Sequence, residues 1–103
     1  MLMKMLMIVA REFMLDELEK LLRKNDITGY TILKEVTGKG KAGRVREKIF
    51  HTGTNVVTLA VLPSDQVDKA IGALKTFVTA RADASHGQLC PLKLFSLPCE
   101  ELI

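Results

Sequence analysis

Glycines and basic side chains are concentrated in one stretch, residues 37–53 (TGKGKAGRVREKIFHTG), whose composition suits the binding of a phosphate or another small anion. Five Lys or Arg residues and one Glu give it a charge of +4, in a chain whose net charge is +3. The basic side chains include Lys41 and Arg44, which can form charge-assisted hydrogen bonds with an anion. Backbone N–H groups of glycines can approach a phosphate closely. The stretch contains three glycines at GxGxxG spacing: Gly38, Gly40 and Gly43.

This GxGxxG does not fit a dinucleotide-binding fold. There the motif lies between a strand and a helix of a parallel unit, whereas here a strand is predicted on either side of it. The glycines therefore either hold a phosphate in another way or make a hinge for a loop. Val45, Ile49 and Phe50 are interleaved with the charges, which favours a loop that docks on its own body, on a ligand or on a partner. We expect a mobile loop or an extended hairpin.

The remaining residues that could do chemistry form no recognised constellation. His51 and His86 have no Cys or carboxylate at ligand spacing, so no metal site is predicted. Cys90 and Cys99 lack a partnered base, and there is no GxSxG or paired-carboxylate motif, so we expect no enzyme. With one Tyr, four Phe and no Trp, the chain also lacks the aromatics of a base-stacking surface. No nucleic-acid partner is expected.

Hydrophobic periodicity predicts six elements in the order βαββαβ. Residues 2–9 are almost continuously apolar, which indicates a covered first strand and not a signal peptide, so the protein is expected to be cytoplasmic. The other strands are predicted at 29–36, 55–62 and 90–97, the last closed by Pro98. One helix runs from Glu12 to residues 25–26, and a second follows an N-cap at Ser64 and ends near Ala82, before a polar loop at 83–88.

This order predicts a ferredoxin-like α+β fold in a single domain, residues 1–103: a four-stranded antiparallel sheet with both helices on one face. Alternate residues on the first and third strands are apolar on both sides of the sheet. One side carries Met3, Met5, Met7 and Val9 with Val57, Leu59 and Val61. Since the helices cover one face, the other must be buried by a further subunit, and oligomerisation is expected.

Three ordered stretches resemble the PII signalling superfamily. Residues 29–31 (GYT) followed by 35–40 (EVTGKG) resemble the second strand running into the root of the family's T-loop. Residues 62–67 (LPSDQV) resemble the start of its second helix, and 93–101 (KLFSLPCEE) the strand that leaves its B-loop. The resemblance implies a homotrimer that binds adenine nucleotides (ATP, ADP or AMP) in clefts between subunits and engages a membrane transporter or an enzyme through the loop at 37–53.

The resemblance also assigns candidate ligand-binding residues. The residues expected beside the base of the nucleotide are Gly29, Tyr30 and Thr31. Those expected near its phosphates are Gly38, Gly40 and Lys93, and the basic loop adds Lys41 and Arg44. The family's GDG is replaced by Cys90-Pro91-Leu92, one extra residue separates Thr31 from Gly38, and the loop has no tyrosine. With the chain stopping at Ile103, before the arginines of classical members, these departures indicate a PII-like, non-classical protein.

Three functions remain open at this point. The first is a PII-like sensor of a small anionic effector. The second is a CutA-like trimer of the same fold that binds a divalent metal, for which His51, His86 and the cysteines would have to converge. The third is an interaction module whose loop caps a partner without any effector.

Overall fold

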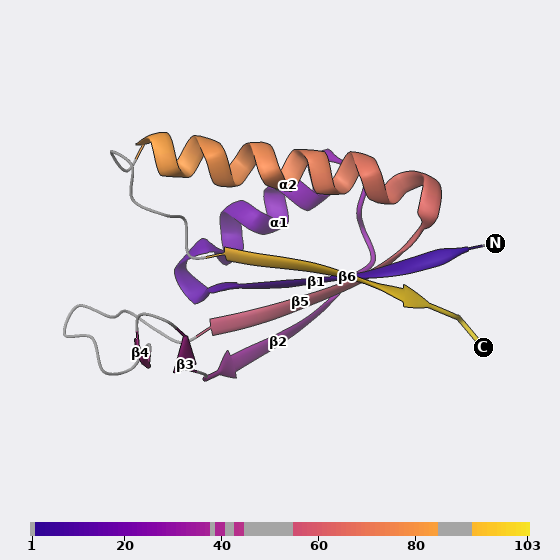
Figure 1. Cartoon of the computed structure of the whole chain (residues 1–103), viewed down its shortest axis with the longest axis horizontal. Coiled ribbons are helices and arrows are strands. Elements are labelled where there is room, and N and C mark those ends of the chain that lie inside the picture. Colours follow the sequence, from indigo (N-terminus) through magenta and orange to yellow (C-terminus); the bar gives the residue numbers. More distant parts are fainter. Residues whose placement is uncertain (1, 38, 41–42, 45–54, 85–91) are drawn as a thin grey trace.

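The computed structural model describes residues 2–37, 39–40, 43–44, 55–84 and 92–103. Its elements follow the predicted βαββαβ order, with a short hairpin added in the long loop, and the ferredoxin-like class is confirmed (Figure 1). The main antiparallel sheet has the order β2-β5-β1-β6. Its strands are β1 (Met3–Arg11), β2 (Thr31–Val36), β5 (Asn55–Pro63) and β6 (Leu92–Cys99). The helices are η1 (Glu12–Met14), α1 (Leu15–Lys24) and α2 (Ser64–Ala84), and the hairpin is β3 (Lys39–Gly40) with β4 (Gly43–Arg44).

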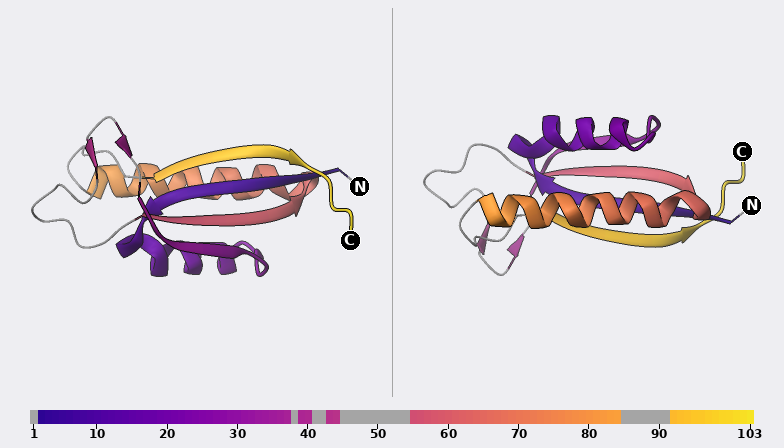
Figure 2. Two further views of the ribbon diagram at one scale, coloured as in Figure 1. Left: turned by 90° about the horizontal axis from the view of Figure 1, so that it is seen from below. Right: turned by 90° about the horizontal axis from the view of Figure 1, so that it is seen from above.

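Both long helices lie on one face of the sheet, as predicted. Figure 2 shows α1 on the side of β2 and β5, and α2 on the side of β6. The core lies between this helix layer and the sheet, because alternate strand residues and one stripe of each helix point into it. Its fully buried side chains include Leu6, Ile8, Val56, Leu18, Leu22, Val67 and Leu74. No helix among the described residues is long and apolar enough to cross a membrane.

The face of the sheet away from the helices is also apolar, as the alternation predicted. We call it the open face. Its residues on the two central strands are all half-buried, in contrast with the buried residues that alternate with them. On the edge strand β6, Phe95 and Leu97 extend the apolar surface, with 51% and 41% of their area exposed. The open face comprises Met3, Met5, Met7, Val9, Val57, Leu59, Val61, Leu33, Phe95 and Leu97.

Helix α1 ends in a Schellman motif at the predicted position. Asp26 has φ 63°, the left-handed conformation of the residue after the C-cap. The Ile27 N–H donates to the Leu22 carbonyl at 2.9 Å, and the Asp26 N–H donates to the Arg23 carbonyl at 3.1 Å. Ile27 is buried beside Leu22, so the motif both satisfies free carbonyls and directs the chain back toward the sheet.

Several predicted boundaries require correction. Helix α2 includes Ser64 itself, which was predicted as its N-cap, and it continues to Ala84 instead of ending near Ala82. Strand β6 extends through Pro98, which was predicted to close it, while the predicted start of this strand at residues 90–91 lies outside the described residues. Proline is tolerated in an edge strand because a backbone nitrogen that faces away from the sheet has no neighbouring strand to which it would donate a hydrogen bond. The rest of the predicted loop at 83–88 lies outside the described residues.

Candidate functional site

The root of the basic loop is a small hairpin beyond the end of β2. Lys39 pairs with Arg44 and Gly40 with Gly43 in an antiparallel ladder. Part of the predicted extended hairpin is therefore present in the backbone. Gly38 and Lys41 lie outside the described residues, as do residues 45–54.

A β-bulge in β2 precedes this hairpin. Leu33 pairs with Val57 and Val36 with Asn55, so β2 has one residue more than β5 in this interval. Glu35 has φ 58° within the bulge. The bulge thus accommodates one extra residue between Thr31 and Gly38, where the sequence departs from the family pattern. Because a bulge bends its strand and redirects the chain beyond it, this one sets the direction in which the loop leaves the sheet.

The residues predicted to lie beside a base are found at the start of β2. Gly29 and Thr31 are exposed, whereas Tyr30 is half-buried and packs against the core. A Cβ added at Gly29 would meet no atom within 4 Å, so within one chain no steric reason requires glycine there. Thr31 pairs with Leu59 and lies on the outer edge of the sheet, because β2 is an edge strand.

Lys93 lies on the opposite edge of the sheet. It is exposed and pairs with Val9 near the start of β6. It therefore shares an end of the sheet with the root of the basic loop, where β2 finishes (Figure 1). Leu92 and Leu94 face the helices. Because successive side chains of a strand point to opposite faces, Lys93 between them lies on the open face.

One chain does not bring all the candidate residues together. From β2 to β6 there are three strand spacings of about 4.8 Å, so Thr31 and Lys93 are separated by roughly 14 Å across the sheet. The two halves of the predicted site, residues 29–31 and Lys93, are thus at opposite edges of the same sheet.

The divalent-metal alternative finds no support among the residues that the structure describes. Within these ranges no three His, Cys, Asp or Glu side chains are grouped as metal ligands. Cys99 is a half-buried free thiol that pairs with Met3 in the β1–β6 ladder. His51, His86 and Cys90 lie outside the described residues.

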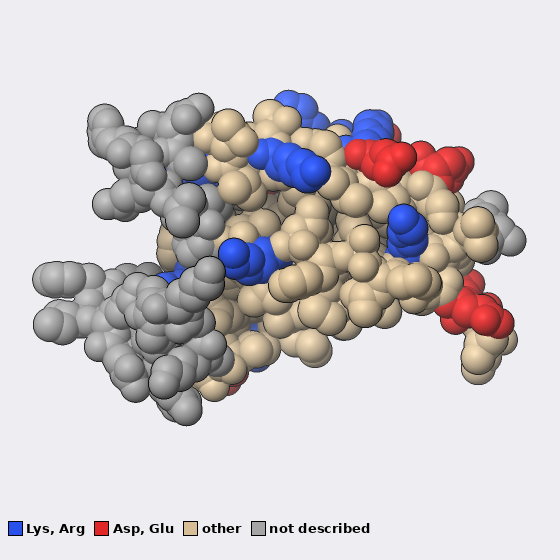
Figure 3. Space-filling view, in the orientation of Figure 1, with Lys and Arg blue, Asp and Glu red and all other residues tan. Residues whose placement is uncertain are grey.

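Two surface features were not found from the sequence. The first is the contribution of β6 to the open face. The sequence analysis considered alternation in the two central strands only, so it did not include β6. The second is a groove between α2 and β6 with Lys75 at its rim. Figure 3 shows that Asp and Glu side chains gather at the end of the molecule where β6 ends and α2 starts, while Lys and Arg side chains lie further along its surface. Leu74 and Val78 were predicted as core residues, and only the packing of β6 beside them creates the groove.

Comparisons with solved structures find PII and PII-like proteins. CPII, a nitrogen regulatory PII-like protein from Thiomonas intermedia K12 bound to ADP, AMP and bicarbonate, matches with a TM-score of 0.66 at 17% identity, covering 100% of this chain and 98% of that one. CPII bound to ADP and bicarbonate matches with a TM-score of 0.66 at 18% identity, covering 96% and 89%. Arabidopsis thaliana PII bound to citrate matches with a TM-score of 0.65 at 20% identity, covering 95% and 78%. At these identities the likeness concerns the fold.

The sequence itself supplies the family. No functionally curated protein matches the chain. The sequence model of the family Nitrogen regulatory protein P-II, however, matches residues 3–102, which is nearly the whole chain. The resemblance inferred from short stretches is confirmed, and this PII-like chain belongs to the PII superfamily, whose signalling members are regulators and not enzymes.

Proposed function

We propose that this PII-like regulator assembles as a homotrimer and senses a small anionic effector, such as an adenine nucleotide, in clefts between its copies. Residues 1–103 act as one cytoplasmic domain. Effector binding orders the loop at 37–53 and changes its fit to a target, either a membrane transporter or an enzyme. A useful switch requires the effector to bind one loop state more tightly than the other by a few kcal/mol.

The open face is the observation that carries the proposed assembly. Its apolar side chains come from all four strands and form rows across the sheet, such as Phe95, Met7 and Leu59. Exposing one large apolar side chain instead of burying it costs roughly 1.5–3 kcal/mol. A contiguous apolar face of this kind marks a protein interface on a soluble domain. A second copy carries an identical apolar face, against which this one can be buried.

The placement of the candidate residues supports a shared cleft. Thr31 and Lys93 occupy opposite edges of one sheet, and association of copies can bring the β2 edge of one beside the β6 edge of the next. The candidate residues of this cleft are Gly29, Tyr30, Thr31, Gly38, Gly40, Lys41, Arg44 and Lys93.

The chemistry of the effector is inferred from charge. The loop carries +4, and Lys93 is an exposed cation at the same end of the sheet as the loop root. The solved PII-like relatives hold ADP, AMP and bicarbonate, and Arabidopsis thaliana PII holds citrate. All of these are anions. A small phosphate- or carboxylate-bearing molecule is therefore the effector class that suits this surface.

Sedimentation equilibrium tests the assembly. We expect the protein to sediment as a trimer, and Met7→Lys to shift it toward the monomer because a charge is placed in the centre of the open face. The matched control is Phe13→Lys, which adds the same charge at an apolar residue that is 56% exposed and lies in η1, off the sheet. A monomeric parent protein, or equal effects of the two variants, would contradict the assembly.

Calorimetry tests the effector. ATP, ADP, AMP and bicarbonate are titrated into the assembled protein, and at least one is expected to bind. Loss of a charge-assisted contact costs about 1.5–3 kcal/mol, so Lys93→Ala is expected to weaken binding by tenfold or more. Lys20→Ala, an exposed lysine on α1, is expected to leave the affinity unchanged. Heat indistinguishable from buffer for every ligand would refute the effector proposal.

A further inference from the structure

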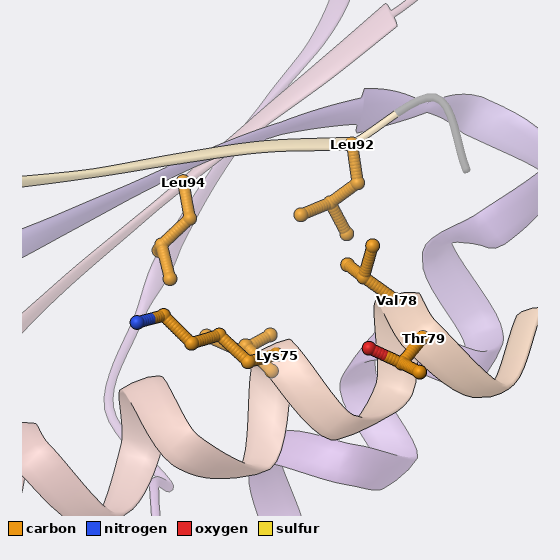
Figure 4. Close-up of a pocket in the computed structure, with 6 residues that line it drawn as sticks. Lys75, Val78, Thr79, Leu92 and Leu94 are labelled. Atoms are coloured by element: carbon orange, nitrogen blue, oxygen red, sulfur yellow. The ribbon is translucent and has the colours of Figure 1, made fainter. Parts of the chain in front are cut away.

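An apolar groove runs between α2 and the edge strand β6, on the helix side of the sheet. It has a volume of about 370 Å³. Figure 4 shows Leu92 and Leu94 pointing from β6 toward α2, and Val78 pointing back toward Leu92. Lys75 extends beneath Leu94 with its amino group at the rim. The groove thus offers aliphatic walls and one cation, beside a strand whose outer edge is unpaired in the sheet.

The segment after β6, residues 100–103 (EELI), has the complementary chemistry. Leu102 is 81% exposed and Ile103 is fully exposed, so neither apolar side chain packs on its own chain. Glu100 and Glu101 are exposed beside them. In Figure 1 this segment leaves the sheet at the end opposite the β3–β4 hairpin. Two aliphatic side chains preceded by carboxylates match a groove with aliphatic walls and a lysine.

The segment cannot reach the groove of its own chain. Leu94, at the nearer end of the groove, is five residues from Cys99, or about 17 Å along an extended strand. The four residues 100–103 span at most about 14 Å even when fully extended. Some of these four residues would also be needed for a turn, because the chain would have to run back along β6. If these residues occupy such a groove, it must be the groove of a second copy.

We propose that residues 101–103 of one copy dock in the α2–β6 groove of another. Leu102 and Ile103 fill the space between Val78 and Leu94, and Glu101 pairs with Lys75. This inference rests on the self-association proposed above, and it adds an exchange of segments that the open face by itself does not require.

Cross-linking tests the exchange. Two forms of the full chain that differ in size by a tag, both with Cys90→Ser and Cys99→Ser, are co-expressed. One carries Thr79→Cys at the rim of the groove and the other Leu102→Cys. Under mild oxidation we expect a disulfide-linked dimer of the tagged and untagged chains. The control replaces Leu102→Cys with Leu2→Cys, whose native residue is also 81% exposed, and should give little product.

The possible outcomes separate this inference from the proposed function. Absence of the mixed dimer, or an equal yield with Leu2→Cys, overturns the docking. If the same sample still sediments as an oligomer, only the docking fails; if it sediments as a monomer, the proposed assembly fails as well. Charge exchange tests the contact with Lys75. Lys75→Glu or Glu101→Lys alone should lower the yield of the mixed dimer several-fold, and the two together should restore it. If the yield is the same in both single variants and in the double variant, the pairing of Glu101 with Lys75 is overturned.

Discussion

Arg81 on α2 holds the carboxylate of Glu17 on α1, with its Nη1 2.7 Å from Oε1 and 2.6 Å from Oε2. This ion pair joins residues 64 positions apart in the chain. The Arg81 guanidinium also lies 5.8 Å from the centre of the Phe77 ring, within range of a cation–π interaction. The pair thus ties the C-terminal half of α2 to the outer surface of α1.

We expect Glu17→Gln to lower the free energy of unfolding by about 0.5 kcal/mol, since both partners remain partly exposed to water. Urea unfolding at fixed protein concentration measures this loss. It should shrink at 1 M salt, where charges are screened over about 3 Å. Glu19→Gln, two residues further along the same helix, is the control and should cost little. A loss that does not depend on salt would argue against an electrostatic origin.

Asp26→Gly is expected to stabilise the protein by about 0.5–1 kcal/mol. Asp26 has φ 63° at the position after the C-cap of α1, where glycine avoids the steric penalty of a Cβ. Removing its carboxylate from the negative end of the helix dipole adds to the gain. The Lys69 Nζ–Asp26 Oδ2 ion pair, 3.7 Å long and exposed, contributes little. Asp26→Asn separates the charge from the backbone effect, and unchanged or lower stability of the glycine variant would count against the strain.

Glu35→Gly is expected to raise the free energy of unfolding by up to about 1 kcal/mol, because Glu35 has φ 58° in the bulge of β2. Glu35→Val should lower it by about 1–2 kcal/mol, since a β-branched residue tolerates that conformation poorly. Lys34→Gly is the matched control. Its backbone φ is not positive, so glycine there should cost about 0.5–1 kcal/mol. If Lys34→Gly and Glu35→Gly changed the free energy of unfolding in the same direction, the bulge geometry would be refuted.

Thr58→Val is expected to stabilise the protein by about 1 kcal/mol. The Thr58 side chain is fully buried between the sheet and the helices, and its Oγ1 has no hydrogen-bond partner among the described residues. Burial of an unsatisfied hydroxyl costs about 1–3 kcal/mol, and valine has nearly the same shape. Thr31→Val, at an exposed position, should change stability by less than about 0.5 kcal/mol. Thermal melts at one protein concentration compare them; a lower melting temperature for Thr58→Val would show that the hydroxyl does bond in solution.

The fold could be predicted because its signals are local. The alternation of side chains along β1 and β5 determines which residues share a face of the sheet, and Leu15, Leu18 and Leu22 recur at helical spacing in α1. The expectation of two apolar faces came from the same alternation. Which residues of a strand or helix share a face depends only on their spacing along the chain. The sequence alone was therefore sufficient to predict these faces.

The tertiary structure decided the features that depend on pairing between distant segments. The bulge at Glu35 arises from the register of β2 against β5, and Pro98 fits in β6 because that strand has only one neighbour in the sheet. Register is set by contacts between residues far apart in sequence, which no local pattern encodes. For that reason the sequence could name the candidate residues, while the register of the sheet determined where Thr31 and Lys93 lie along their strands.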